Sequence, residues 1–224
     1  MTNTTIAVLL YGDYPELAER CLRPISQLYA SDVPVIICAN EIGDKTRQVV
    51  SDLGLKITFD ENPQIFKYPM LAKVTEAVKT PYLMWFDDDS YIRDNPEPWL
   101  FGIELEMGRS DLDLMGAVYT IGLRESQVDW IKTRPWYRGK DIPRRPCFAT
   151  GGWWAAKVRS LRNLGWPDPE VKHRGGDVML GVALQQNGMA LKHYRTGVAI
   201  NANELGQESQ SKRRGFDEAP VGIK

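Results

Sequence analysis

The amino-acid sequence predicts an α/β fold in which helices flank a mostly parallel sheet. Over the first 90 residues, short apolar segments of strand length alternate with segments that carry apolar residues at helical spacing. This alternation is typical of βαβ units, whose strands are parallel and joined by right-handed crossovers. The 224 residues, 43% of them hydrophobic and 25% charged, are enough to bury one large core.

Each expected element of the first half rests on its own local pattern. The strands are short apolar runs, expected at residues 6–10, 33–39, 55–59 and 82–86. The helices have apolar residues three or four positions apart, and are expected at 15–29, 44–53 and 70–78. Gly54 follows the second of these helices and is a favourable residue for ending it.

The second half is less regular. Helices are expected at residues 96–107, 158–164 and 178–186. Strands are expected at 114–121, 148–156, 190–194 and 197–200, with the second of them interrupted by two glycines. Residues 132–146 are rich in Arg, Lys and Pro and are expected to form a loop. No internal repeat or linker is visible, so we expect one domain.

Composition excludes several classes of protein. A net charge of −1 excludes a general polycation, so any anionic partner must be bound by a local patch. The three cysteines are far apart and favour neither a disulfide framework nor a zinc site. No segment has the length and apolarity of a membrane span, and the N-terminus does not resemble a secretory signal. We therefore expect a cytoplasmic protein with no membrane span.

The most informative segment is the apolar strand at residues 82–86, which ends in three consecutive carboxylates, Asp87, Asp88 and Asp89. Open α/β sheets bind ligands at the carboxyl ends of their strands. Three adjacent anions repel one another unless a cation neutralises them, and carboxylate oxygens suit Mg²⁺ and Mn²⁺. A solvated turn is the alternative for an acidic triplet alone, but a turn does not require the preceding apolar strand.

Four features follow one another along the chain: an α/β first half, the acidic triplet, residues 148–154 (FATGGWW), and residues 175–181 (GGDVMLG) followed by His193. Over roughly residues 4–200 this order resembles the GT-A glycosyltransferases. The first half is similar to family 2 enzymes, and the motifs are similar to fringe-type β-1,3-glycosyltransferases. The resemblance implies a single GT-A domain with a mostly parallel, Rossmann-like sheet.

The implied domain covers residues 1–203 and is followed by a polar tail at 204–224. Its nucleotide-binding half is expected at about residues 1–90, and its acceptor half at about 91–203.

The resemblance assigns the triplet to the family's Asp-x-Asp motif. It implies that Asp89 ligates Mn²⁺ or Mg²⁺, that Asp87 lies near the ribose or a metal-bound water, and that Asp88 belongs to the same nucleotide-sugar-binding segment. His193 matches a histidine that completes the metal site in many such enzymes, as suits a neutral imidazole. A surface histidine without a ligand role is the alternative.

Asp177 matches the general base of inverting members, which accepts the proton of the acceptor hydroxyl. The sequence departs from the family pattern at Gly176, where an acidic residue is common. Asp177 is also well suited to cap the helix that follows it, and both roles are compatible.

Residues on the acceptor side are expected to contact the sugar. Gly151 and Gly152 allow the backbone to approach a ligand closely, although a simple bulge also explains them. Trp153 and Trp154 are suited to stacking on a sugar or base. Because side chains alternate along a strand, one of the two is expected in the core.

Four further residues are expected to bind the nucleotide sugar. Tyr11, Gly12 and Asn40 lie at the ends of the first two strands, where this fold holds the base, although loop capping also explains Asn40. Lys73 resembles a basic residue that precedes the acidic motif in fringe-type enzymes, and a solvated helix lysine is its alternative.

Residues 132–145 form a basic segment with interleaved aromatic residues. Arg138, Arg144 and Arg145 can bind phosphates, and Trp136 can stack on a base. A flexible lid over the donor is the alternative. The basic segment therefore leaves an anionic acceptor open, including DNA or RNA with a hydroxylated base.

The sequence thus predicts a metal-dependent, hexosyltransferase-type glycosyltransferase that uses a nucleotide sugar, with UDP favoured over GDP by family habit. A nucleotidyltransferase is the alternative within enzymes, although Tyr11-Gly12-Asp13 is not the Gly-rich basic loop such enzymes use. A non-catalytic carbohydrate- or nucleic-acid-binding protein on the same scaffold is the alternative from another class.

Overall fold

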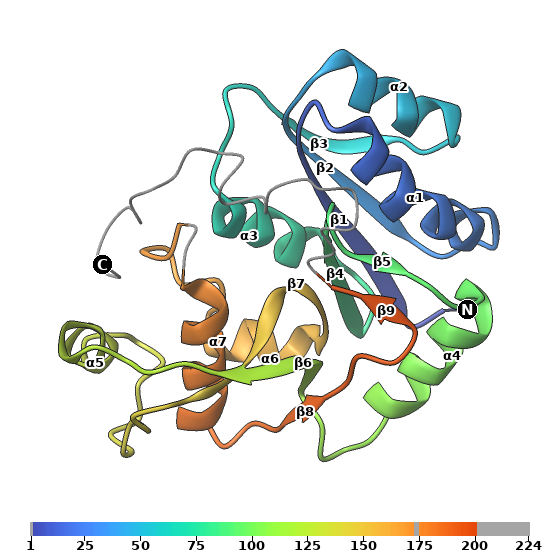
Figure 1. The fold of residues 1–224 in the computed structure, drawn as a ribbon. Coiled ribbons are helices and arrows are strands. Elements are labelled where there is room, and N and C mark those ends of the chain that lie inside the picture. Colours follow the sequence, from blue (N-terminus) through green and yellow to red (C-terminus); the bar gives the residue numbers. More distant parts are fainter. Residues whose placement is uncertain (1, 173–174, 201–224) are drawn as a thin grey trace.

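The computed structural model describes residues 2–172 and 175–200, and over these residues it confirms the expected α/β fold. A central sheet is covered by helices on both faces (Figure 1). The strands are β1 (Thr4–Gly12), β2 (Val35–Ile42), β3 (Ile57–Glu61), β4 (Tyr82–Asp87), β5 (Tyr91–Ile92), β6 (Leu114–Thr120), β7 (Cys147–Lys157), β8 (Leu191–His193) and β9 (Val198–Ala199). The helices are α1 (Pro15–Ala30), α2 (Asp44–Asp52), α3 (Lys67–Ala77), α4 (Pro96–Met107), α5 (Glu125–Lys132), α6 (Val158–Leu164) and α7 (Gly176–Gln186).

The main sheet has seven strands in the order β3-β2-β1-β4-β7-β6-β8. All neighbours are parallel except at β7, which runs antiparallel to both β4 and β6. A small second sheet pairs β5 with β9. From β1 the chain continues to β2 on one side, whereas β4 lies on the other side of β1. The carboxyl ends of β1 and β4 therefore flank a topological switch point, where open α/β sheets bind ligands.

Alternation along the strands divides the core into two layers. In β1, Ala7 and Leu9 pack toward α3, α6 and α7, whereas Val8 and Leu10 pack toward α1 and α4. The same alternation in β4 places Trp85 on the α3 side. This alternation also sets the face of the sheet to which each side chain at the carboxyl end of β4 points.

The structure corrects the prediction that two glycines interrupt the strand at 148–156. β7 is one continuous strand of 11 residues. Its pairing with β6 shifts, because Gly116 pairs with Trp154 but Val118 already pairs with Ala149. The extra residues of β7, which include both glycines, form a bulge beside the end of β4.

One helix prediction changes, and the structure adds one helix that was not expected. The helix expected at 70–78 begins at Lys67, three residues earlier than its apolar pattern. α5 was not expected, because Ile131 is its one buried residue and its periodic pattern is weak. The N-terminus of α5 is fixed instead by Gln127 Oε1, which accepts a hydrogen bond from the Arg124 N–H at 2.9 Å. The expected tail at 204–224 lies outside the described residues.

Candidate active site

The acidic triplet lies at the carboxyl end of β4 and is almost fully buried. Asp87, Asp88 and Asp89 expose 7%, 3% and 4% of their surface. The Trp85 Nε1–H donates a hydrogen bond to Asp87 Oδ1 at 2.9 Å. Burial raises the pKa of the Cys21 thiol on α1 well above its usual value, and the charges of Asp88, Asp89 and Asp87 raise it further. The triplet is therefore a buried concentration of negative charge and not a solvated turn.

Lys67 is in direct contact with the triplet. Its Nζ lies 2.5 Å from Asp87 Oδ2 and donates to the carbonyl oxygen of Gly151 at 2.7 Å. The two side chains are only 7% and 10% exposed, so water screens this ion pair weakly. Helix α3, strand β4 and the bulge of β7 thus meet at one ammonium group.

Asp177 lies close to the same group, in the first turn of α7. Burial raises the pKa of its carboxyl, whereas the charge of Lys67 and hydrogen bonds from the backbone N–H groups of Val178 and Gly151 act in the opposite direction. A Cβ added at Gly151 would lie 2.9 Å from Lys67 Nζ and 3.9 Å from Asp177 Cβ. The helix cap is Gly175, with φ of 76°, so Asp177 is not the N-cap residue. The structure therefore brings Asp87, Gly151 and Asp177 together, as the motif order suggested.

Gly176 departs from the family pattern for a steric reason. A Cβ at this position would lie 2.0 Å from Cζ of Tyr68, which is 5% exposed. Burial raises the pKa of the Tyr68 hydroxyl well above its usual value, and the nearby Asp177 and Asp87 charges raise it further. With the Tyr68 ring in this place, no side chain fits at position 176.

The residues expected at the nucleotide edge separate into two groups. Tyr11 and Gly12 end β1 beside β4, Tyr11 is partly exposed, and Gly12 adopts a φ of 68°. Asn40 is fully buried, and its Oδ1 accepts the Ile65 N–H at 2.8 Å while its Nδ2 donates to the Ile65 carbonyl. Asn40 therefore holds the loop before α3, which is the capping alternative. Its neighbour Glu41 has a φ of 61°, a conformation that is uncommon for a residue with a side chain.

Neither tryptophan of the FATGGWW motif is available for stacking, so that prediction is wrong. Trp153 is 0% exposed and packs against Trp99 in the α1–α4 layer. Trp154 is 3% exposed and stacks on Trp85 in the opposite layer, with ring centroids 6.1 Å apart. Alternation does place the rings on opposite faces, but helices cover both faces here.

The prediction that His193 completes a metal site with the triplet is also wrong. His193 ends β8, which lies three strands from β4 at the outer edge of the sheet. At a spacing of about 4.8 Å per strand, its backbone lies roughly 14 Å from β4. Its Nδ1 accepts the Val118 N–H at 3.1 Å, and the side chain is exposed.

Lys73 and Lys67 lie on the same helix but in different surroundings. Lys73 is 45% exposed and forms an ion pair with Glu61. Lys67, which the sequence analysis did not identify, is the lysine in contact with Asp87. Its position 20 residues before Asp87 and directly before Tyr68 carries no local signal of this contact.

The basic segment at 132–145 has one buried aromatic anchor. Trp136 is 1% exposed, and its Nε1–H donates to Asp168 Oδ2 at 2.9 Å, so the prediction that it stacks on a base is wrong. Arg138 donates to the Pro135 carbonyl at 2.7 Å. Arg144 and Arg145 are exposed, just before β7 begins.

The donor atoms at the triplet fit a divalent cation in type. In the part of the chain that the structure describes, no three His, Cys, Asp or Glu side chains are arranged to hold a metal ion. Mg²⁺-type sites, however, commonly use one or two carboxylates together with phosphate oxygens of the substrate. Both oxygens of Asp87 already accept hydrogen bonds, from Lys67 and Trp85. Asp89 is the direct ligand that the Asp-x-Asp resemblance implies, with Asp87 beside it.

Comparisons with known proteins give matches in structure only. No family model matches the chain, and no curated protein matches it in sequence. A mannosyltransferase from Pyrobaculum calidifontis, solved with GDP-Man and Mn²⁺, matches with a TM-score of 0.59 and 15% identity, over 87% of this chain and 55% of its own. Glucosyl-3-phosphoglycerate synthase from Mycobacterium tuberculosis, solved with Mn²⁺, UDP-Glc and phosphoglyceric acid, matches with a TM-score of 0.60 and 16% identity, over 95% and 74%.

A third match comes from a different class of enzyme. CMP:2-keto-3-deoxy-manno-octonic acid synthetase, complexed with CTP, has a TM-score of 0.53 and 13% identity, over 96% of this chain and 98% of its own. Within the described residues, no helix has the length and apolarity needed to cross a membrane. The present chain spans about half the length of the mannosyltransferase and nearly all of the CTP-bound synthetase. At these identities the matches establish the fold alone: the chain has a GT-A fold, as the motif order predicted.

Proposed function

We propose that this protein is a metal-dependent glycosyltransferase that moves a sugar from a nucleotide-sugar donor to an acceptor hydroxyl. The observation that carries the proposal is the meeting of Lys67, Asp87, Gly151 and Asp177 at the carboxyl end of β4. Four separate elements contribute these groups beside the switch point of the sheet. Two proteins of the same fold were solved with Mn²⁺ and a nucleotide sugar, UDP-Glc in one and GDP-Man in the other.

The donor would lie across the ends of β1 and β4. Tyr11 and Gly12, at the end of β1, would line this edge on the nucleotide side, and Lys67 would offer an ammonium group to the diphosphate or sugar. A cation held by Asp89 would stabilise the charge of the departing diphosphate. UDP is the first nucleotide to test, with GDP as the second.

Asp177 is the proposed general base. The acceptor oxygen forms a bond to the anomeric carbon while the bond from that carbon to the diphosphate breaks, and the hydroxyl proton passes to the Asp177 carboxylate. Displacement from the opposite face inverts the configuration at the anomeric carbon. A base works best when its pKa lies near the working pH, and burial raises the pKa of Asp177 in that direction.

An anionic acceptor is the class that the basic segment favours, and a nucleic acid carrying a hydroxylated base is one member. Arg144 and Arg145 are exposed and directly precede β7, which carries Gly151. Binding of a polyanion should weaken steeply as salt rises, because counterions are released on binding. Arg144→Ala/Arg145→Ala should flatten that salt slope, and a flat wild-type series would exclude a polyanionic acceptor.

The match to the CTP-bound synthetase makes a nucleotidyltransferase the second candidate. That chemistry requires donors for a triphosphate after β1. Here the turn is Tyr11-Gly12-Asp13, and Asp13 Oδ1 accepts hydrogen bonds from the Thr46 N–H at 3.0 Å and hydroxyl at 3.3 Å. A carboxylate committed to α2 in this position disfavours a triphosphate.

One assay separates these candidates. The protein is incubated with a panel of UDP and GDP sugars, or with nucleoside triphosphates, in Mn²⁺ or in EDTA. Release of nucleoside diphosphate from one sugar nucleotide, in Mn²⁺ only and reduced in Asp177→Asn, is expected. Release of pyrophosphate from a triphosphate would instead support the nucleotidyltransferase. If a sugar nucleotide binds but no nucleoside diphosphate is released, whichever acceptor is added, the result would support a non-catalytic binding protein.

A further inference from the structure

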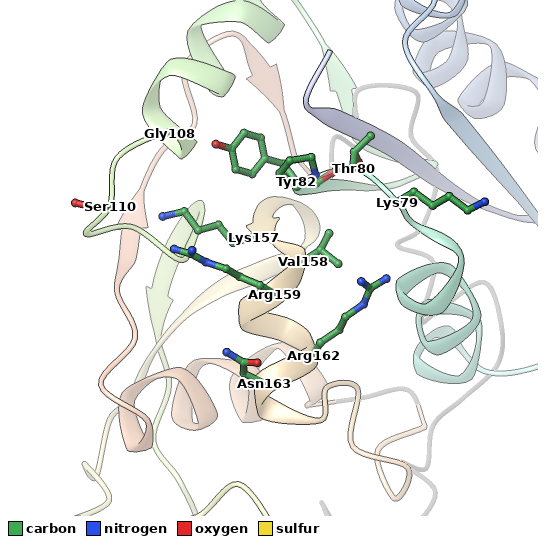
Figure 2. Close-up of a pocket in the computed structure, with 11 residues that line it drawn as sticks. Lys79, Thr80, Tyr82, Gly108, Ser110, Lys157, Val158, Arg159, Arg162 and Asn163 are labelled. Carbon is green, nitrogen blue, oxygen red and sulfur yellow. Dashed lines mark hydrogen bonds between the residues drawn. The ribbon is translucent and has the colours of Figure 1, made fainter. Parts of the chain in front are cut away.

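A cavity lies at the amino end of β4, at the opposite end of the strand from the triplet. It has a volume of about 660 Å³ and is formed where β4 begins, β7 ends and α6 begins (Figure 2). Tyr82 at the start of β4 pairs with Lys157 at the end of β7, so these residues fix the position of this amino-edge pocket. Such a volume is within the range of small-molecule sites.

The lining of the amino-edge pocket is strongly cationic. Lys79, Lys157, Arg159 and Arg162 line it, and no Asp or Glu does. In Figure 2 the Lys157 and Arg159 side chains extend toward the same side, to which the Tyr82 hydroxyl also points, whereas the Lys79 and Arg162 side chains lie on the other side of Val158. Cations gathered without a counterion repel one another, so an anion would stabilise the arrangement.

Lys157 shows that this charge is built into the fold. It is 4% exposed, and its Nζ donates at 2.6 Å to the carbonyl oxygen of Arg109, a neutral acceptor. None of the ion pairs among the described residues includes one of the four pocket cations. A buried ammonium group without a carboxylate is costly unless another anion approaches it.

The two carboxylates that follow the lining residue Ser110 in sequence are committed elsewhere. Asp111 is paired with Arg109 at 3.3 Å, and the pKa of its carboxyl is lowered mainly by that hydrogen bond, with Lys157 the smallest of the contributing charges. Asp113 accepts hydrogen bonds from the Ser160 hydroxyl at 2.6 Å and the Ala190 N–H at 2.9 Å. Neither residue lines the pocket.

The arginines differ in how firmly they are held. Arg162 Nη2 donates to the carbonyl oxygens of Thr75 and Val78 at 2.9 and 2.7 Å, which fixes its guanidinium at the C-terminal end of α3. Arg159 is exposed. A buried lysine and an exposed arginine able to close on a ligand, Lys157 and Arg159, together match the several oxygens of a phosphate group, while Arg162 keeps the opposite wall of the pocket cationic.

We propose that the amino-edge pocket binds a small phosphorylated solute, with its phosphate group held by Lys157 and Arg159. The site lies at the opposite end of β4 from Asp87, so its ligand is neither the donor nor the acceptor of the proposed transfer reaction. The inference does not rest on that reaction.

The test is calorimetric titration of the full chain with inorganic pyrophosphate and with inorganic phosphate, at about 0.15 M salt and in EDTA. Without a metal the acidic triplet repels these anions, so binding there does not interfere. Saturable binding of one equivalent is expected. Arg159→Ala should weaken it about tenfold or more, as loss of a charged hydrogen bond does. Arg195→Ala, which removes an exposed arginine that follows β8, should leave it unchanged.

A second arm separates a solute from a lipid headgroup. Vesicles of phosphatidylcholine with and without phosphatidic acid are sedimented with the wild-type protein, and no association with either is expected. Three results would overturn the proposal: no saturable binding of either anion, equal loss in Arg159→Ala and Arg195→Ala, or binding to phosphatidic acid vesicles without binding of either anion in solution.

Discussion

Replacing Lys67 by methionine should lower the free energy of unfolding by about 3–5 kcal/mol, because it leaves a buried carboxylate without its cation. Lys67 and Asp87 are 7% and 10% exposed, and their charged atoms lie 2.5 Å apart. Methionine retains most of the apolar stem of lysine, so little of this loss comes from packing.

Lys73→Met is the matched control on the same helix. Lys73 pairs with Glu61, but these side chains are 45% and 22% exposed, so solvent screens the pair and the lysine can relax into water. Loss of such an exposed pair should cost about 0–1 kcal/mol. The two variants thus remove the same charge from one helix and differ in burial.

Thermal unfolding followed by circular dichroism in EDTA measures both variants. For a chain of this length about 1 kcal/mol corresponds to roughly 2–4 °C in Tm. The Tm should therefore fall by about 6–20 °C in Lys67→Met and by less than about 4 °C in Lys73→Met. Adding Asp87→Asn to Lys67→Met removes the unpaired charge and should recover part of the loss. An equal Tm for Lys67→Met and Lys73→Met would refute the argument from burial.

Three further predictions concern the candidate active site. Asp177→Asn should lower turnover by roughly 10²–10⁴-fold with donor affinity retained. Because burial raises the pKa of Asp177, its protonated form stabilises the fold below a pH of about 3.9, and this contribution is lost as pH rises through the raised pKa. The free energy of unfolding should therefore fall less with rising pH in the variant than in the wild type. Gly151→Ala should displace Lys67 Nζ and reduce turnover by up to about 10²-fold without loss of the fold, whereas Gly122→Ala, whose Cβ meets nothing within 4 Å, should have wild-type kinetics. Asp89→Asn should abolish Mn²⁺-dependent donor binding in calorimetry, and His193→Ala should retain it; loss in both would restore His193 as a ligand.

The sequence was sufficient to predict the fold and the elements that bring three candidate residues together, because those features depend on local patterns. The apolar run before Asp87 defines β4 and therefore its carboxyl end. Gly151 and Asp177 lie within short motifs whose strand and helix were both expected. When those elements pack on one sheet, Asp87, Gly151 and Asp177 come close together.

Lys67 could not be predicted in the same way. It begins α3, and the residue before it, Phe66, makes no side-chain capping bond, so the usual signal for a helix start is missing. A lysine in the first turn of a helix is disfavoured by the helix dipole. That local conflict is resolved only by Asp87, which is 20 residues away in sequence and arrives through the fold.

His193 and Trp136 were misassigned because strand order and burial are not local properties. A histidine that ends a late strand looks suitable for a metal site until the sheet order places β8 three strands from β4. Trp136 stands among basic residues in sequence, but its indole N–H is bound to Asp168, 32 residues further on.

Lys67 connects the two chemical roles that the proposed reaction requires. It holds Asp87, beside the carboxylate proposed to bind the cation, and its charge also opposes the rise in pKa that burial imposes on Asp177. Burial alone would favour a protonated Asp177, which cannot accept a proton from an acceptor hydroxyl. A single buried ammonium group thus opposes the effect of burial on the proposed base and also contacts the carboxylate of the donor side. This dual role explains why the chain places an unfavourable lysine at the start of α3.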